Sequence, residues 1–86
     1  MYAVVVEVEI LDDTEARTEL ENVVAMVKEF PGLVAGHWVR LDEGHGTSLV
    51  LFETEEQANA AKPPPGGDAK GVKMTSIRVG EVLASI

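Results

Sequence analysis

Hydrophobic and polar residues alternate through the first ten positions of the chain. The even positions are all apolar: Tyr2, Val4, Val6, Val8 and Ile10. The odd positions are apolar up to Val5 and acidic at Glu7 and Glu9. Because neighbouring side chains on a β-strand point to opposite faces, the pattern predicts a strand over Tyr2–Ile10 with one dry face and one half-polar face.

The spacing of apolar residues then changes to three and four, which is typical of an amphipathic helix. The predicted inward stripe contains Ala16, Leu20, Val23, Val24 and Val27, and the predicted water-facing residues are Arg17, Glu21 and Lys28. Oxygen-bearing side chains in Leu11–Glu15 can accept hydrogen bonds from free N–H groups at a helix start. Pro31 disfavours helical geometry at the residue before it, and Gly32 can adopt a positive φ. We therefore predict a helix between Leu11–Glu15 and Pro31.

Two further apolar runs, Leu33–Leu41 and Thr47–Glu53, flank a short segment that contains two glycines. Glycine supplies the unusual backbone angles that a hairpin turn or bulge requires, so the segment Asp42–Gly46 predicts an antiparallel hairpin. Its register stays open, because a shift of one residue decides whether Trp38 lies opposite Val50 or Leu49.

The next segment has the signature of a helix start. Thr54 and Gln57 match a capping box, in which each side chain satisfies a backbone N–H group. The predicted helix runs to about Lys62. Its inward candidates, Ala58 and Ala61, are small, so the helix either lies close on the sheet or leaves a gap beside it. That gap is the first candidate pocket.

Three consecutive prolines predict a loop over Lys62–Asp68, because proline removes a backbone donor and fixes an extended φ. Alternation resumes at about Val72 and continues to Leu83. It predicts a fourth strand, with Gly80 as a candidate bulge.

The element order is β-α-β-β-α-β, which predicts an α+β, ferredoxin-like domain over residues 1–86. We expect a four-stranded antiparallel sheet with two helices on one face. The other face carries apolar residues on several strands, and a chain of 86 residues is close to the size at which a single core is marginal. A second copy covering that face would form a homodimer.

Composition excludes several classes of function. The net charge of −8 opposes binding to nucleic acid and to anionic membranes, because those surfaces attract Lys and Arg. The chain has no cysteine, which removes disulfides, thiolate nucleophiles and cysteine-based metal sites. The first ten residues contain Glu7 and Glu9 and no basic residue, so we expect no signal peptide, and no apolar run is long enough for a membrane span. We expect a soluble, cytoplasmic protein.

Candidate chemistry is concentrated on the second predicted strand. Histidine is the residue type best suited to general acid–base chemistry near neutral pH. Of His37 and His45, His37, beside Trp38, is the better catalytic candidate, although a structural histidine is the simpler interpretation. Trp38 and Arg40 share a strand face and could stack on and ion-pair with an aromatic acid, or else pack and pair within the protein. Arg78 is a further candidate substrate contact. The two histidines lack zinc-site spacing, so we predict neither metal nor cofactor.

The runs Pro31–Gly36 and Leu49–Ala58 resemble the dimeric α/β-barrel superfamily, and within it the antibiotic-biosynthesis-monooxygenase-like proteins. In that family a PGF-type break precedes strand two, and a strand ending in W/F-E-[ST] leads into helix two. The resemblance implies a homodimer whose two sheets pack into a barrel, with a cleft between sheet and helices in each subunit. The haem-degrading branch uses an Asn on strand one, which Tyr2–Ile10 lacks, so its catalytic residues do not carry over.

Two classes of function follow as hypotheses. One is a cofactor-independent, monooxygenase-like enzyme that orients a small aromatic or polyketide-like substrate near His37 and Trp38. The other is a non-catalytic dimer that binds a small apolar or aromatic molecule or serves as an accessory module. Convergence of polar groups in one pocket would favour the enzyme.

Overall fold

The computed structural model describes residues 1–63 and 69–86 and confirms the predicted element order. The elements are β1 (Tyr2–Ile10), α1 (Asp13–Val27), β2 (Leu33–Asp42), β3 (His45–Phe52), α2 (Glu55–Ala61) and β4 (Val72–Glu81). Residues 64–68 of the predicted loop lie outside the described residues. No helix in the described residues has the length and apolarity that crossing a membrane requires.

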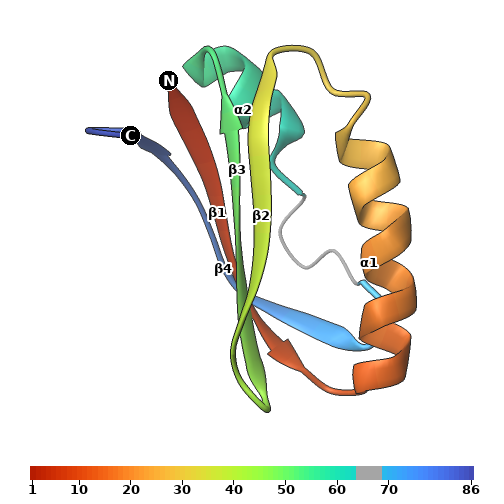
Figure 1. The fold of residues 1–86 in the computed structure, drawn as a ribbon. Coiled ribbons are helices and arrows are strands. Elements are labelled where there is room, and N and C mark those ends of the chain that lie inside the picture. The colour runs from red at the N-terminus through yellow and green to blue at the C-terminus, as the bar shows by residue number, and fades with distance from the viewer. Residues whose placement is uncertain (64–68) are drawn as a thin grey trace.

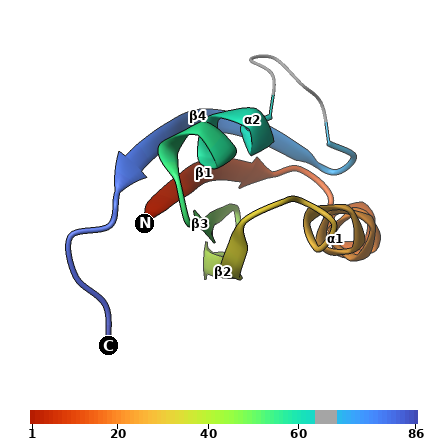
Figure 2. The same cartoon turned by 90° about the horizontal axis from the view of Figure 1, so that it is seen from above.

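The four strands form one antiparallel sheet in the order β2-β3-β1-β4. Figures 1 and 2 show α1 beside one face of this sheet, while the segment after β4 leaves on the opposite side. The α+β, ferredoxin-like fold is therefore confirmed.

The β2–β3 hairpin has a register that differs from both predicted alternatives. Trp38 lies opposite Ser48, and His37 lies opposite Leu49. The difference arises because the strands extend further than predicted, until Asp42 pairs with His45 across a two-residue turn. An irregularity between Arg40 and Asp42 then shifts the pairing by one residue.

The turn is stabilised by a side chain rather than by unusual glycine angles. The Asp42 carboxylate accepts a hydrogen bond from the Gly44 N–H and contacts the His45 ring, both at 2.8 Å. Neither Gly44 nor Gly46 has a positive φ, so the predicted role for these glycines is wrong. Gly46 lies at a close approach of two strands, because a Cβ there would lie 3.2 Å from the Val39 carbonyl oxygen, which is a tight contact.

Both predicted helix starts are confirmed by their caps. The Asp12 side chain accepts a hydrogen bond from the Glu15 N–H at 2.9 Å. Thr54 and Gln57 form the complete capping box, with both hydrogen bonds at 3.2 Å. Gly32, after α1, has a φ of 77°, as expected for a turn that follows a helix.

The irregularity in β4 lies at Thr75 and not at Gly80. Gly80 pairs regularly with Ala3, whereas the pairing with β1 shifts between Glu7 and Val8. The Thr75 hydroxyl donates to the Glu7 carbonyl oxygen at 3.1 Å, which adds a side-chain bond where the ladder is interrupted.

The core lies between the sheet and its helices. Its buried members are Val4, Val6, Val27, Val50, Phe52 and Ala58. Phe52 is fully buried, and its ring centroid lies 6.5 Å from that of Phe30. Ala58 is also fully buried. Because Ala58 carries only a methyl group, α2 lies close on the sheet, which resolves the two alternatives left open for this helix.

Candidate functional site

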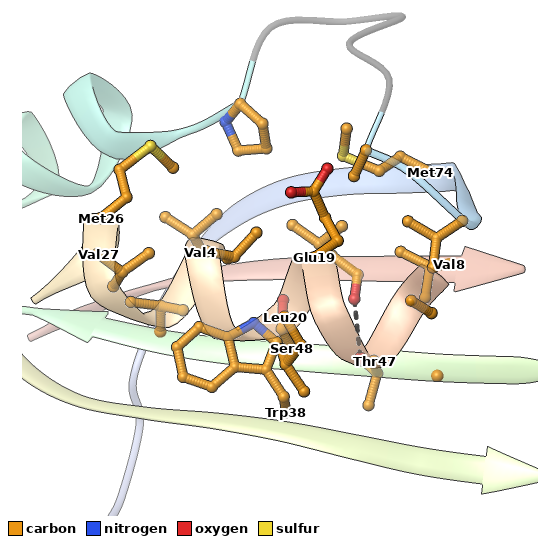
Figure 3. A pocket seen from close by; sticks show the side chains of 18 of the residues that line it. Val4, Val8, Glu19, Leu20, Met26, Val27, Trp38, Thr47, Ser48 and Met74 are labelled. Atoms are coloured by element: carbon orange, nitrogen blue, oxygen red, sulfur yellow. Dashed lines mark hydrogen bonds between the residues drawn. The ribbon is translucent and has the colours of Figure 1, made fainter. Parts of the chain in front are cut away.

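A cavity of about 910 Å³ lies between α1 and the sheet and is the candidate site. Figure 3 shows side chains from α1 and from the strands converging on it. Most of its wall is apolar. The strands contribute Val4, Val6, Val8, Ile10, Val50, Phe52 and Met74, and α1 contributes Ala16, Leu20, Val23, Met26 and Val27.

The cavity exists because α1 stands away from the sheet. In the described part of the chain, α2 makes close backbone contacts with β1, β3 and β4, whereas any backbone contacts of α1 with a strand are fewer. Four members of the predicted inward stripe of α1 do line the cavity, but Leu20 keeps 38% of its surface exposed. The predicted gap beside α2 is therefore only the edge of this space, where Ala60 and Ala61 contribute to the wall.

Two polar groups interrupt the apolar wall on the sheet side. Trp38 and the buried Ser48 are neighbours across the β2–β3 ladder, and Figure 3 shows both side chains at the cavity. The adjacent Thr47 uses its hydroxyl within the sheet, donating to the Val6 carbonyl oxygen at 3.1 Å. The indole N–H and the Ser48 hydroxyl can thus orient a mainly apolar molecule.

Charged side chains are found where α1 begins. Asp13 accepts a hydrogen bond from Arg17 Nε at 2.9 Å and a second from Arg40 of β2. The hydrogen bonds from Arg17 and then Arg40 lower the pKa of the Asp13 carboxyl below its usual value, so this group is ionised at neutral pH. The ion pair with Arg40 links α1 to β2 at this end of the cavity.

A second charged contact lies on the side of α1 that faces the segment before β4. Glu19 accepts a hydrogen bond from the backbone N–H of Lys70 at 2.8 Å. Both residues line the cavity, as do Lys62 and Pro63 after α2.

The predicted site residues fall on two different faces. Trp38 and Arg40 both line the cavity, as their alternation along the strand predicts. His37 is exposed and lies opposite Leu49, on the other face, so the structure does not bring His37 and Trp38 together. His37 and Trp38 lie apart because the side chains of adjacent residues on a strand project to opposite faces of the sheet.

Arg78 also lies on the open face, paired with Val5 rather than with the acidic residues of β1. Glu9 lies between His45 and Lys73 on the neighbouring strands. Within residues 1–63 and 69–86, no group of three or more His, Asp or Glu residues is arranged to hold a metal ion.

Sequence reasoning missed Asp13, Arg17 and Ser48 as cavity residues. Asp13 and Arg17 have the four-residue spacing of a helical ion pair, which is a visible signal, but Arg17 was expected only to face water. The contact of Asp13 with Arg40 joins residues 27 positions apart and has no local signature. Ser48 could have been placed only with the correct hairpin register.

Comparisons with known proteins support the fold. No family model matches the sequence, and no curated protein sequence matches it significantly. The crystal structure of HapK from Hahella chejuensis is similar, with 13% sequence identity and a TM-score of 0.64 over 99% of this chain and 95% of the HapK chain. At this identity the similarity shows the ferredoxin-like fold alone.

Proposed function

We propose that this protein binds a small, mainly apolar molecule in the cavity between α1 and the sheet. The observation that carries the proposal is the cavity itself. Its volume of about 910 Å³ falls within the range of small-molecule sites, roughly 300–1,000 Å³. Its apolar wall with few polar groups, among them Trp38 and Ser48, is the usual composition of such a site.

Binding without catalysis is the better supported of the two functional classes. His37 and His45 are exposed and belong to β2 and β3, and neither lines the cavity. The titratable groups that do line it are the charged residues at its edges, and Asp13 is already engaged by two arginines. Glu19, the other acidic residue among the described cavity residues, accepts a hydrogen bond from the backbone N–H of Lys70.

Direct ligand binding tests the proposal. The uncharged fluorophore 1-aminoanthracene should bind purified protein with increased emission, because burial in an apolar site shields it from water. Val23→Trp places an indole in the cavity and should weaken this binding at least tenfold. Glu21→Trp adds the same side chain on the exposed side of α1 and serves as the matched control. Equal binding by wild type and Val23→Trp, or no binding by wild type, would contradict the proposal.

A cofactor-independent, monooxygenase-like activity is the second candidate. It is favoured by the position of Trp38 in the cavity wall, where an aromatic substrate could stack, and by the resemblance of Pro31–Gly36 and Leu49–Ala58 to antibiotic-biosynthesis-monooxygenase-like proteins. A ligand recovered with the purified protein by native mass spectrometry provides the substrate for an oxygen-uptake assay. Uptake that is lost in Trp38→Ala and kept in His37→Ala would support the enzyme. A ligand returned unchanged, without oxygen uptake, would contradict it.

We further propose that the open face of the sheet forms a homodimer. Val39 and Leu49 keep 49% and 40% of their surface exposed on this face, and Val5 pairs with Leu49. Leu49→Arg should convert the dimer to a monomer, because it would bury an unpaired charge at the centre of the interface. Sedimentation of the wild type as a stable monomer at micromolar concentration would rule out this assembly.

A further inference from the structure

The net charge of the residues that line the cavity is opposite in sign to the net charge of the whole chain. The chain has fifteen acidic and seven basic residues. Among residues 1–63 and 69–86, the cavity is lined by two acidic residues, Asp13 and Glu19, and by four basic ones. The basic residues are Arg17, Arg40, Lys62 and Lys70. The described lining residues of this acidic protein thus carry a net charge of +2, which attracts an anion.

Two of these basic residues, Arg17 and Arg40, lie close together where α1 and β2 meet. Arg17 and Arg40 approach the same carboxylate, that of Asp13, which leaves one positive charge uncompensated within this group. Three hydrogen bonds from the two guanidinium groups are formed within the described residues, two to Asp13 and one to the Glu43 carbonyl oxygen. Most of their N–H groups therefore remain available to a further acceptor.

The other end of the cavity is apolar. Met26, Val27, Phe30 and Phe52 line it at the C-terminal end of α1, and the last three belong to the core or pack against it. Trp38 lies two residues from Arg40 on the same face of β2. A molecule lying along α1 would meet guanidinium groups at one end and aromatic and aliphatic side chains along the rest of its length.

We propose that the ligand is an apolar carboxylic acid whose carboxylate binds Arg17 and Arg40. Its hydrocarbon or aromatic body occupies the space between Trp38 and Phe52. This inference rests on the proposed binding function and names the class of molecule. Arginine suits this role because its planar donors match the two oxygens of a carboxylate.

The test compares decanoate with decanol, two probes of equal chain length that differ in charge. Each competes with 1-aminoanthracene at neutral pH, low salt and concentrations below micelle formation. Wild-type protein should bind decanoate about fivefold to tenfold more tightly than decanol, since both arginines are partly exposed and water weakens the interaction. The preference should decrease as salt is added.

Three variants locate the charge effect. The double variant Arg17→Gln, Arg40→Gln should bind both probes about equally. Arg17→Gln alone should reduce the preference for decanoate without disturbing the fold, because the Arg17 side chain is 73% exposed. Arg78→Gln removes an arginine from the open face and should leave the preference unchanged. Circular dichroism confirms that each variant is folded.

The outcomes separate this inference from the function on which it rests. Equal binding of decanoate and decanol by the wild type would overturn the carboxylate inference, while displacement of 1-aminoanthracene by either probe would still support an apolar binding site. A preference that survives in the double variant would overturn the assignment to Arg17 and Arg40. Failure of 1-aminoanthracene to bind at all would overturn the binding function itself.

Discussion

The two helices cover the same sheet in different ways. α2 has seven residues, and its buried Ala58 brings it into close contact with three strands. α1 has fifteen residues and a longer apolar stripe, yet it stands off the sheet over a cavity of about 910 Å³. The shorter and less hydrophobic helix therefore forms the tighter contact with the sheet. A small side chain such as Ala58 allows this close approach.

α1 is held mainly at its ends. At the N-terminal end, the Gly71 carbonyl oxygen accepts hydrogen bonds from the backbone N–H groups of Leu11 and Asp12, at 2.7 and 3.1 Å. At the C-terminal end, Val27 is buried in the core and Phe30 packs against it. The middle of the helix is free to form one wall of the cavity, so a binding site can exist there without disturbing the core beneath α2.

The largest effect should come from breaking the buried core. Phe52→Ala removes a fully buried ring and should lower the free energy of unfolding by about 3–5 kcal/mol. Leu20→Ala, under the middle of α1, should cost less than about 1 kcal/mol, because this side chain is partly exposed and faces empty space. Urea unfolding measures both values. Similar losses would mean that the middle of α1 is packed as tightly as the core.

The next largest effect should come from detaching the N-terminal end of α1. Gly71 has a φ of 80°, and a Cβ there would lie 2.5 Å from the Ala16 backbone nitrogen. Gly71→Ala should therefore cost about 1–3 kcal/mol in unfolding free energy. Gly80→Ala is the control, because nothing lies within 4 Å of its added Cβ. A Gly71→Ala variant as stable as Gly80→Ala would show that α1 does not depend on this anchor.

The cap of α2 should contribute less. Thr54→Ala removes the hydroxyl that accepts from the Gln57 N–H and should lower the free energy of unfolding by about 1 kcal/mol. Thr18→Ala, on α1, provides a comparison, since its hydroxyl donates to the Thr14 carbonyl oxygen within the helix and caps nothing. If Thr54→Ala unfolds at the same urea concentration as wild type, tertiary contacts alone hold α2 in place.

The smallest effect should be the pH dependence of the ion pairs between α1 and β2. Arg17 and Arg40 lower the folded-state pKa of Asp13 below its ordinary value of 3.8. The ionised carboxylate therefore stabilises the fold above that value, and the contribution is lost as the pH falls through the lower, folded-state pKa. The stability difference between wild type and Asp13→Asn should shrink over this acidic range. A difference that stays constant down to the lowest pH at which the protein folds would contradict this linkage.

Much of the architecture could be predicted because its signals are local. Asp12 and the pair Thr54 and Gln57 satisfy backbone groups within three residues of themselves, so their side chains alone indicate where each helix begins. The alternation over Tyr2–Ile10 likewise depends only on neighbouring residues.

The candidate site was harder to predict because its members come from distant segments. Trp38 and Arg40 were correctly assigned to one face, since a strand has period two. To predict that Ser48 lies beside Trp38 on that face, the register of the hairpin must be known. That register was mispredicted because the turn depends on Asp42, whose side chain takes the role expected of glycine.

The sequence by itself determined the types of the elements, their order and the faces of each strand, because these follow from periodicity and from hydrogen bonds between near neighbours. Only the tertiary structure decided that α2 lies close on the sheet, that α1 stands away from it, and that Asp13 joins Arg17 to Arg40 at the cavity. The distance between a helix and a sheet depends on how side chains from several segments fit together. A pattern of apolar residues specifies which face is buried but not how completely the space beneath it is filled.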